Sequence, residues 1–568
     1  MLVKRLDELL CGIAGVLDKH GGDVVPILKG MLELIKHRGP DGFGFCANDM
    51  IQRVRTMEEL DLSNCRSDRA IGHSRLAIVG GMSGIQPLQG CKKGLTILHN
   101  GEIYNHKKLR RELEHEHSFE TFSDSEAIVH LLEEYYDGDL TVALAKTLTR
   151  LDGVFAIAAL AGNELVIARD VMGVKQLYFS EGPRLIAFAS EKKALWGIGF
   201  ENTGKRLLPG HMAALGRDGI KMVQVLQPPL HQKTQYITDM EAAQRSYASS
   251  LRKAVSKRVE DQDKIGVIFS GGIDSVLIAK MVKDQGKNFT CYTAGTEESD
   301  DFRHATSAAS RLGFELRSNK LDMDKLERYI PQIIEIIEDR SLGQVEVALP
   351  IYAAVTLAHE DGVRVMLTGQ AADELFAGYP WYRGVADKEG YKELTGHMLD
   401  DLMKLYKETL EREDKILMAH SIELRVPYLD PELVMVSTGI ATELKLPPGD
   451  SVGKHVHREV AIQMGIPEDL AYRTKQAAQH GSGVHQLIEN LAIARGFDED
   501  MLKSMSYSTS RSVPEILGSS QRYGHLYSEE KIWVTPDHVQ LYLDTIAYEN
   551  NLTNKDDRIL LESLLELS

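Results

Sequence analysis

The chain has 568 residues, 43% of them hydrophobic, and this length exceeds what one hydrophobic core usually organises, so two or more domains are expected. Its 66 basic and 83 acidic side chains give a net charge of −17, which argues against nonspecific binding to nucleic acid. No apolar run has the length of a membrane span, and Met1 to Leu10 lacks the apolar core of a signal peptide, so we expect a cytoplasmic protein without membrane contact.

The five cysteines are scattered along the chain and do not suggest a disulfide framework. No Cys-x-x-Cys pair occurs, so a structural zinc site is not expected. Most of these thiols are expected to be buried as small hydrophobic side chains. They are Cys11, Cys46, Cys65, Cys91 and Cys291, of which Cys11 stands apart because it opens an apolar, strand-like run.

The first 215 residues contain several short clusters of polar and glycine residues. Taken singly, each is a weak signal, because Arg-Gly-Pro-Asp-Gly suits a turn and Asn-Gly suits a hairpin. In their order and spacing they resemble the class II glutamine amidotransferase domain, an N-terminal-nucleophile hydrolase with an αββα sandwich fold. The clusters are Cys11–Val16, His37–Gly42, Gly72–Ile78, His99–Asn105, Ser123–Glu126, Leu151–Ala156 and Ala168–Lys175.

The resemblance implies a nucleophile and an oxyanion hole in this half. Cys11 would attack the amide carbonyl of glutamine as a thiolate. Its own α-amino group would be the base, which requires Cys11 to be the first residue of the mature chain. The side chain of Asn100 and the backbone N–H of Gly101 would then stabilise the tetrahedral oxyanion.

The resemblance also implies a glutamine-binding set. The guanidinium of Arg75 would bind the α-carboxylate of glutamine. The carboxylate of Asp124 would bind the α-ammonium, with Glu102 nearby. Two simpler interpretations stay open: Arg75 could form a surface ion pair, and Asp124 could cap a helix that begins near Glu126.

Ten residues precede Cys11, whereas the family pattern begins Met-Cys. While they remain, the nitrogen of Cys11 is an amide and cannot act as a base. Residues 1–10 could be a propeptide that is cleaved, the glutaminase could be inactive, or the start site could be misassigned. We favour the third explanation, in which Leu10 corresponds to a UUG codon read as the initiator methionine.

The second half alternates strand-like and helical segments. Polar, proline-containing sequence predicts a linker over residues 216–239, followed by a helix from Met240 to Val259. An apolar run at 265–269 predicts a buried strand, followed by a glycine turn and a helix. With further strands expected at 289–295 and 363–369, the pattern predicts a parallel α/β sheet with ligands at the carboxyl ends of its strands.

The glycine turn, Ser270-Gly271-Gly272-Ile273-Asp274-Ser275, is the most specific motif of this half. Its backbone N–H groups and the positive end of the following helix suit an anion. It lacks the lysine of a Walker A loop and resembles the pyrophosphate loop of N-type ATP pyrophosphatases, although alone it could be an ordinary strand-to-helix turn. Further clusters lie at 368–379, 418–430, 454–459 and 473–476. Together with the amidotransferase half, they resemble the B-type glutamine-hydrolysing asparagine synthetases over nearly the whole chain.

This second resemblance implies roles for individual residues. Without it, Asp373-Glu374 could be a solvated acidic turn and Lys454 a surface helix lysine. Pyrophosphate would be bound by Ser270, Gly271, Gly272 and Ser275, and adenosine would be contacted by Thr368 and Gly369. Mg²⁺ would be bound by Asp274 and Asp373, and Lys454 would neutralise charge on the phosphates. The substrate or intermediate would be faced by Gln370, Asp373 and Glu374.

Three positions depart from the family pattern. Many bacterial relatives carry Glu where this chain has Gln370, and a neutral amide cannot act as a general base. The role is therefore dispensable, Glu374 fills it, or the acceptor differs. Ala371 and Ala377 replace glycines often seen in the family, and we expect negative φ at both because alanine is strained at positive φ.

We therefore expect a leader or misassigned start at 1–10, a glutaminase domain at 11–215, a linker at 216–239 and an ATP pyrophosphatase domain at 240–568 whose last part is helical. The expected reaction makes asparagine from aspartate, glutamine and ATP through β-aspartyl-AMP and internally transferred ammonia. ATP and Mg²⁺ are the expected cofactors, and a homodimer is possible. The alternatives are an amide ligase for another carboxylate, a noncatalytic relative, and an ammonia-dependent synthetase with a silent glutaminase.

Overall fold

The computed structural model describes residues 11–552 except 40, 49, 76–83, 93, 201–203, 232–235, 451, 474–477, 499, 502–536 and 551. The expected leader, residues 1–10, lies outside the described residues, as do residues 474–476 of the last sequence cluster. The chain divides into two compact units. Unit 1 comprises Met1–Pro228 and Tyr406–Glu423, and unit 2 comprises Pro229–Leu405 and Leu424–Ser568.

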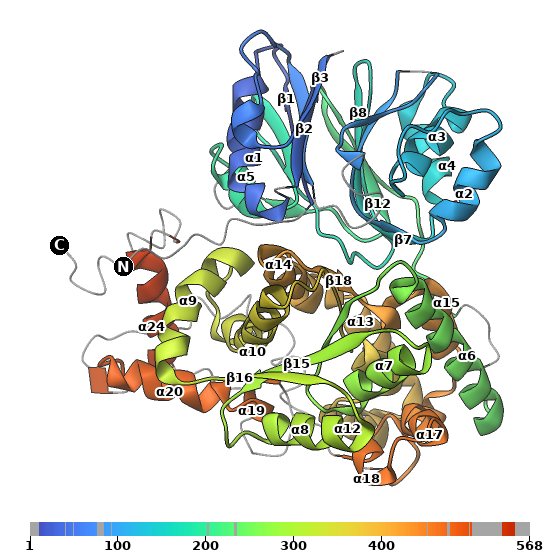
Figure 1. Ribbon diagram of the computed structural model, residues 1–568, viewed down its shortest axis with the longest axis vertical. Coiled ribbons are helices and arrows are strands. Elements are labelled where there is room, and N and C mark those ends of the chain that lie inside the picture. The colour runs from blue at the N-terminus through green and yellow to red at the C-terminus, as the bar shows by residue number, and fades with distance from the viewer. Residues whose placement is uncertain are drawn as a thin grey trace. The chain divides into compact units, whose positions relative to one another are not determined.

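Unit 1 contains two stacked β-sheets with helices on both outer faces (Figure 1). The first sheet has the strand order β11 (Lys205–Arg206), β9 (Tyr178–Glu181), β10 (Leu185–Ala189), β1 (Gly12–Asp18), β4 (Arg69–Arg75), β2 (Gly42–Ala47), β3 (Met50–Val54). The second has the order β13 (Gly219–Gln224), β12 (His211–Gly216), β8 (Glu164–Arg169), β7 (Gly153–Ala161), β6 (Thr96–Ile103), β5 (Leu88–Gln89). Neighbouring strands of both sheets pair antiparallel in the described part of the chain.

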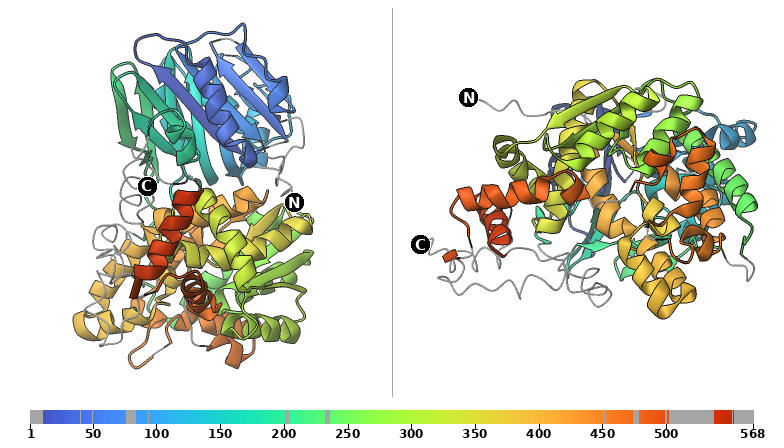
Figure 2. Two further views of the ribbon diagram at one scale, coloured as in Figure 1. Left: turned by 90° about the vertical axis from the view of Figure 1, so that its left-hand side faces the viewer. Right: turned by 90° about the horizontal axis from the view of Figure 1, so that it is seen from below.

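The outer helices of unit 1 fall into two groups. The helices α1 (Val25–Leu34) and α5 (Lys192–Trp196) pack on the first sheet, and Figure 2 shows α1, in blue, lying across its strands. The second sheet is covered by α2 (His106–Leu113), α3 (Glu126–Tyr135) and α4 (Leu140–Leu148). Short 3₁₀ turns, η1 (Lys36–Arg38) and η2 (Met57–Glu59), complete this part of the chain.

Strand β1 illustrates why the sequence folds into a sandwich. Ile13 and Leu17 belong to the core between the two sheets, whereas Ala14 and Val16 belong to the core beneath α1 and α5. Successive side chains of a strand point to opposite faces. A strand that is covered on both faces therefore needs an unbroken apolar run, and this is what the sequence after Cys11 provides. The αββα sandwich predicted for this half is confirmed.

Unit 1 also includes a segment from the second half of the sequence, with a π-helical turn η4 (Tyr406–Leu410) and helix α14 (Glu411–Ala419). Asp414 of this helix pairs with Arg38 at 3.0 Å and with Lys175 at 3.0 Å, and all three side chains are buried. Glu411 pairs with Arg206 at 2.8 Å. This arrangement could not be predicted from sequence, because Asp414 and Glu411 lie in no recognisable motif.

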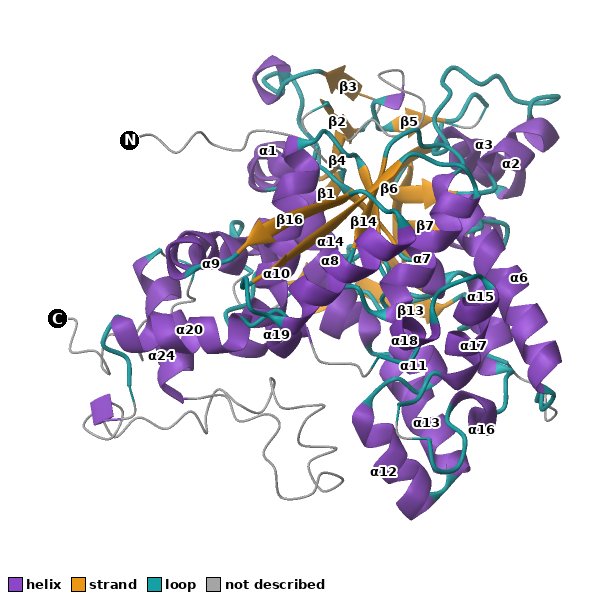
Figure 3. Cartoon of the chain, turned by 60° about the horizontal axis from the view of Figure 1, so that its bottom comes forward, coloured by secondary structure: helices purple, strands orange, loops and turns teal. Residues whose placement is uncertain are grey.

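Unit 2 is built on a sheet in the order β16 (Leu316–Lys320), β15 (Phe289–Gly295), β14 (Ile265–Ile268), β17 (Val365–Leu367), β18 (Glu423–Arg425). The first four strands pair in parallel, as predicted. The surrounding helices include α7 (Ile273–Asp284), α8 (Asp300–Leu312) and α10 (Leu342–Glu360). Figure 1 draws α10 and α8 on opposite sides of β15, and Figure 3 shows α7 and α8 beside strands β14 and β16.

The other helices of unit 2 surround this sheet. They are α6 (Met240–Val259), α9 (Met323–Ile337), α11 (Ala372–Phe376), α12 (Pro380–Glu389), α13 (Tyr391–Leu402), η5 (Pro427–Leu429), α15 (Pro431–Thr438), α16 (Thr442–Lys445), α17 (His455–Gln463), α18 (Glu468–Ala471), α19 (Ala478–Gly481), α20 (Val484–Ala494) and α24 (Asp537–Glu549). The last described helix, α24, packs on α9, α10 and α20 of the same unit, as expected for the helical end of this half.

Several sequence predictions can be compared with these elements. The helix predicted from Met240 to Val259 has these bounds, and the predicted strand at 289–295 is β15. Strand β16 was not predicted, because four of its five residues are polar and three of the five are exposed. The range 216–239, expected to be a linker, contains β13, a strand at the edge of its sheet in which four of six residues are exposed.

Among the described residues, no single helix is long and apolar enough to cross a membrane. Helices α9 and α10 together have the length and apolar composition of a membrane span, but the chain bends by 109° between them.

We predict that Asp414→Asn destabilises unit 1 by about 3–5 kcal/mol, because it leaves the buried cations of Arg38 and Lys175 without their shared carboxylate. The matched control is Glu112→Gln, which breaks the half-exposed pair with Arg150 and is expected to cost at most about 1 kcal/mol. Denaturant unfolding of both variants measures the difference, and equal losses would contradict the importance of Asp414.

Candidate active sites

Unit 1 contains a hollow of about 420 Å³, including the part open to solvent. All six residues that the sequence assigned to glutamine chemistry lie in its wall. They come from the start of β1, the end of β4, the second half of β6 and the segment before α3. The lining residues are Cys11, Arg75, Gln86, His99, Asn100, Gly101, Glu102, Ser123, Asp124, Ser125, Met418 and Glu423.

Asn100 is the most informative residue of this pocket. Its side chain is 1% exposed, and neither its Nδ2 nor its Oδ1 has a hydrogen-bond partner among the described residues. A buried amide without a partner costs about 1–3 kcal/mol, so such a group is retained where a ligand completes it. The amide lines the same hollow as Cys11, which suits a donor for an oxyanion.

Gly101 has to be glycine for reasons of space and conformation. Its φ is +150°, a region that side chains rarely adopt, and an added Cβ would overlap the carbonyl oxygen of Val154 on the paired strand β7. Asn100-Gly101 therefore lies inside strand β6 and not in a hairpin turn. The close pairing of β6 with β7 holds this part of the pocket wall in place.

Arg75 and Asp124 supply opposite charges to the pocket. Arg75 is buried, which excludes a surface ion pair, and burial lowers the pKa of its guanidinium. One oxygen of Asp124 accepts a hydrogen bond from the backbone of Ile103 at 2.9 Å. Helix α3 begins after Ser125, and no side-chain cap forms there, so Asp124 is not the helix cap. A molecule with a carboxylate and an ammonium on one carbon matches this charge pair.

Arg38 fixes the backbone of the nucleophile, and the sequence did not assign it a role. Its Nε donates a hydrogen bond to the carbonyl oxygen of Cys11 at 3.0 Å, while its terminal nitrogens pair with Glu191 at 2.7 Å and with Asp414 at 3.0 Å. Because all three charged side chains are buried, the position of Cys11 is tied to a fully paired charge cluster.

Met418 and Glu423 were assigned by sequence to the second half, within the cluster 418–430. In the structure both line the pocket of unit 1. That assignment was wrong for these two residues, because a helix distant in sequence folds onto unit 1 through Asp414 and Glu411.

The second candidate site lies in unit 2, at the carboxyl ends of β14 and β17. Strands β14 and β17 are neighbours in the sheet. From β14 the chain continues to β15 on one side, and from β17 it continues to β18 on the other side. Ligands bind at such a switch point in open parallel sheets. The turn 270–275 follows β14, and the segment 368–374 follows β17, so both predicted ligand loops are located there.

The turn after β14 has the geometry expected of an anion-binding loop. Gly271 has φ +70°, and a Cβ there would lie 2.6 Å from the backbone nitrogen of Ala305. Gly272 caps the twelve-residue helix α7, and Ser275 donates a hydrogen bond back to the Gly272 carbonyl at 3.0 Å. Ser270 is exposed, as a ligand-facing residue has to be. The backbone N–H groups at the start of α7 suit a phosphate.

Lys454 joins the two carboxylates that the sequence assigned to a metal. Its Nζ lies 2.6 Å from Asp274 and 2.7 Å from Asp373. The Lys454 side chain is 1% exposed and Asp373 is buried, so neither a surface lysine nor a solvated acidic turn describes them. Burial lowers the pKa of Lys454, while Asp274 counteracts this effect. His457 also approaches Asp274, at 3.2 Å.

Glu374 is the buried acid next to this cluster. Burial raises the pKa of Glu374 to about 7, and the hydroxyl of Tyr379 donates a hydrogen bond to its carboxylate. An acid with a pKa near 7 can exchange a proton at neutral pH. Gln370 lies on the same loop and is half-buried. Of Gln370 and Glu374, only Glu374 can therefore accept or donate a proton.

The expectation of negative φ at Ala371 and Ala377 is wrong. Ala371 has φ +78° and Ala377 has φ +57°, and Lys454 has φ +59°. The two alanines flank helix α11, which has only five residues, so the chain enters and leaves it through left-handed conformations. Such a conformation costs an alanine about 1–2 kcal/mol.

We predict that Glu374→Gln changes how stability depends on pH. The pKa of Glu374 is about 7 in the native protein and near the ordinary value of 4.5 in the unfolded chain. Between these pH values the native protein holds a proton that the unfolded chain releases, so stability falls as pH rises through this window. The loss amounts to about 3 kcal/mol at neutral pH. The glutamine variant lacks this loss. The difference between its thermal midpoint and that of the native protein should therefore grow in favour of the variant from pH 4.5 to 7 and stay constant above pH 7.

The control for this experiment is Glu443→Gln in helix α16, whose side chain is exposed. Its midpoint should follow that of the native protein at every pH. Parallel curves for Glu374→Gln over the whole range would contradict the raised pKa.

Comparison with known proteins covers both units. A family model described as a glutamine amidotransferase domain matches residues 10–207, and one described as asparagine synthase matches residues 246–392 and 384–544. A Methanocaldococcus jannaschii relative that carries the name of a glutamine-hydrolysing asparagine synthetase is 33% identical over 553 residues, covering 87% of this chain and 99% of its own length.

Further relatives are more distant. The glutamine-hydrolysing asparagine synthetase 1 of Arabidopsis thaliana is 28% identical and covers 89% of this chain and 84% of its own length. That of Rattus norvegicus is 28% identical and covers 83% of this chain and 84% of its own. A solved glutamine phosphoribosylpyrophosphate amidotransferase from B. subtilis is 21% identical over 51% of this chain and 67% of its own, with a TM-score of 0.35, too low to add to the argument. With an amidotransferase match on the sandwich, an asparagine synthase match on the parallel-sheet half, and a relative 33% identical over 99% of its own length, this chain belongs to the glutamine-hydrolysing asparagine synthetase family.

Proposed function

We propose that the protein synthesises asparagine from aspartate, with glutamine as the nitrogen donor and ATP as the source of energy. The observation that carries the proposal is the pocket of unit 1. The buried amide of Asn100, without a partner among the described residues, lines it together with Cys11, Arg75 and Asp124. A noncatalytic relative would not need to retain such a costly group. The family relationship over both units supports the pairing with ATP chemistry.

In the first step, the thiolate of Cys11 attacks the side-chain amide of glutamine. Arg75 and Asp124 orient the substrate through its α-carboxylate and α-ammonium. Asn100 and Gly101 stabilise the oxyanion, and Arg38 holds the carbonyl of Cys11 in place. Ammonia leaves as the thioester forms, and water then releases glutamate.

The base of this step is the α-amino group of Cys11 itself. It exists as an amine only when residues 1–10 are absent from the mature chain. The proposal therefore includes a mature N-terminus at Cys11, by removal of the leader or by initiation at the Leu10 codon.

In the second step, the turn 270–275 binds the phosphates of ATP, and Thr368 and Gly369 contact the adenosine. Asp274 and Asp373 would hold Mg²⁺, since two carboxylates facing phosphate oxygens are the donors that this ion takes. When bound, Mg²⁺ supplies positive charge to the phosphates. Lys454, already between both carboxylates, neutralises the charge that develops as the β-carboxylate of aspartate attacks the α-phosphorus.

Ammonia then attacks β-aspartyl-AMP, and a proton has to leave the incoming nitrogen. We propose that Glu374 accepts this proton, since burial raises the pKa of its carboxyl group to about 7. Gln370 would contact the substrate by hydrogen bonds.

The replacement of a glutamate by Gln370 favours a second candidate, an amide ligase for another carboxylate. Internal transfer of ammonia, a homodimer and a cytoplasmic location are further parts of the proposal.

The first test measures asparagine formation from aspartate, ATP and Mg²⁺ with either glutamine or ammonia. We expect product with both nitrogen sources. Product with ammonia alone would indicate a silent glutaminase, and no product with either would direct attention to a different carboxylate.

We predict that Cys11→Ala abolishes the glutamine-dependent reaction by about 10³-fold or more, because the nucleophile is lost. The ammonia-dependent reaction of the same variant is the internal control and should stay within about twofold, since Cys11 takes no part in it. Intact mass of the native protein should show an N-terminus at Cys11. A chain that retains residues 1–10 and still uses glutamine would contradict the role of the α-amino group.

We predict that Gly378→Ala reduces asparagine synthesis at least about 10²-fold with either nitrogen source. A Cβ at Gly378 would overlap the Oδ1 of Asp373 and the Cε of Lys454, and would push this ion pair apart. Glutamine hydrolysis should be retained. The matched control is Gly396→Ala in helix α13, where an added Cβ meets no heavy atom within 4 Å. Equal activity of the two variants would exclude Asp373 and Lys454 from the reaction.

A further inference from the structure

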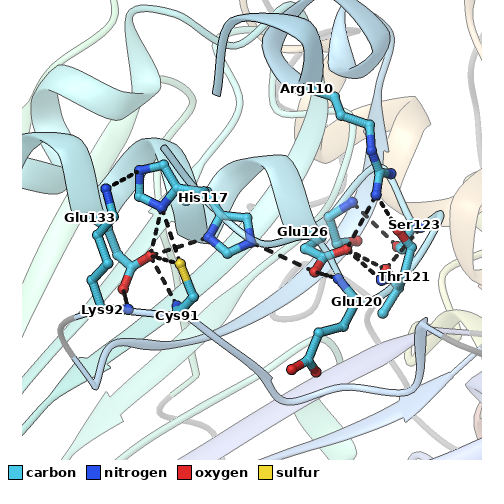
Figure 4. A network of polar contacts seen from close by, with 11 residues as sticks. Cys91, Lys92, Arg110, His117, Glu120, Thr121, Ser123, Glu126 and Glu133 are labelled. Atoms are coloured by element: carbon cyan, nitrogen blue, oxygen red, sulfur yellow. Dashed lines mark hydrogen bonds and ion pairs between the residues drawn. The ribbon is translucent and has the colours of Figure 1, made fainter. Parts of the chain in front are cut away.

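A second polar cluster in unit 1 lies outside the glutamine pocket. It brings together Cys91 from the loop after β5, His117 from the loop after α2, and His130 and Glu133 from helix α3 (Figure 4). The three last-named side chains are buried, and Cys91 is exposed. One potential ligand atom of each residue lies within 4.8 Å of all the others.

Four of the ligand–ligand distances within this cluster, 3.1–3.6 Å, are close to those of a tetrahedral site. Nitrogen, oxygen and sulfur ligands of a tetrahedral Zn²⁺ ion are about 3.3–3.6 Å apart, given the usual metal–ligand bond lengths. Here the Sγ of Cys91 lies 3.4 Å from the Nδ1 of His117 and 3.6 Å from the Oε2 of Glu133. The Oε2 of Glu133 lies 3.1 Å from the Nδ1 of His117 and 3.1 Å from that of His130.

The outer nitrogens of both histidines lie near carboxylates. The Nε2 of His117 is hydrogen-bonded to Glu134 at 2.6 Å. The Nε2 of His130 lies 3.6 Å from Glu126, which is beyond hydrogen-bond distance, and it has no hydrogen-bond partner among the described residues. Histidine ligands of metals usually donate their second N–H to a carboxylate or carbonyl, which fixes the ring and its tautomer. This arrangement therefore leaves the Nδ1 atom of each ring to face the centre of the cluster.

Hydrogen bonds alone do not satisfy this cluster well. The ring of His117 has a carboxylate within hydrogen-bond distance of both nitrogens, whereas a neutral imidazole carries one N–H. The buried Nε2 of His130 has no hydrogen-bond partner among the described residues. The Oε2 of Glu133 is also approached by the backbone N–H and the thiol of Cys91. Four donors would converge on one oxygen with two lone pairs. A cation at the centre removes this conflict, because it replaces the protons on the two Nδ1 atoms and on sulfur.

We propose that Cys91, His117, His130 and Glu133 bind one Zn²⁺ ion. A thiolate with imidazole ligands favours zinc over Mg²⁺ or Ca²⁺, and four protein ligands make a structural site and not a catalytic one. The ion fastens the loop after β5 to helix α3. The exposed Cys91 provides the entry side, and the Oε1 of Glu133 is held by the backbone N–H of Lys92 at 2.6 Å.

The site is connected to the glutamine pocket through helix α3. The segment 123–125, which lines the pocket, leads directly into this helix. Glu126, which faces the outer nitrogen of His130, accepts hydrogen bonds from Glu120 at 2.6 Å and from Thr121 at 2.8 Å (Figure 4). Zinc binding would thus hold the loop that carries Asp124, one of the groups assigned to glutamine.

The test is a titration of the full-length, metal-free protein with Co²⁺, which replaces Zn²⁺ and is visible by absorption. We expect one equivalent per chain, with the visible bands of tetrahedral Co²⁺ and a near-ultraviolet thiolate charge-transfer band, and displacement of both by Zn²⁺. Cys91→Ser should lose the charge-transfer band. His117→Gln should bind at least about 10-fold more weakly.

The matched control is His115→Gln, an exposed histidine two residues from His117, which should titrate like the native protein. A spectrum retained in both Cys91→Ser and His117→Gln would place the ion elsewhere and overturn the proposal, as would the absence of saturable binding. As an independent readout, a chelator should lower the thermal midpoint of the native protein but not that of His117→Gln. Equal shifts for the two proteins would also overturn the proposal.

Discussion

The pocket of unit 1 depends on one buried carboxylate, that of Asp414. One of its oxygens pairs with Arg38 and the other with Lys175, and all three side chains are removed from water. Burying an ion costs several kcal/mol, so such a group is tolerated only when its charge is fully paired. Burial acts to raise the pKa of Asp414, but the two cations outweigh it and hold the pKa below its usual value. The cluster therefore stays ionised, and through Arg38 it positions Cys11.

Unit 2 uses a buried charge differently. Lys454 is shared by Asp274 and Asp373, so two carboxylates are held with a single positive charge between them. Two carboxylates beside phosphate oxygens are the donors that Mg²⁺ takes. Asp414 is a carboxylate that lies between two cations, whereas Lys454 is a cation that lies between two carboxylates. That difference separates a structural ion-pair cluster from one suited to binding a charged substrate.

The sequence predicted those parts of the sites that are continuous along the chain. A turn between a strand and a helix, such as 270–275, is determined by neighbouring residues, and parallel strands bring such turns to the same edge. Asp414 could not be predicted, because its partners Arg38 and Lys175 are 376 and 239 residues away. The same limitation applies to Cys91, His117 and Glu133. Without a Cys-x-x-Cys pair the sequence argued against zinc, since its ligands would come from three separate segments.

The prediction of negative φ at Ala371 and Ala377 failed for a different reason. Alanine is strained at positive φ, but this strain is too small to exclude it there. Glycine would relieve strain of about 1–2 kcal/mol at Ala371 or Ala377. It would also remove a buried methyl group worth about 0.8 kcal/mol and add about 0.5–1 kcal/mol of chain entropy in the unfolded state. These contributions nearly cancel, so alanine and glycine are almost equivalent at these positions. The conformation of the loop is therefore maintained by its surroundings, including the ion pair between Asp373 and Lys454, and not by the identity of the residue that adopts it.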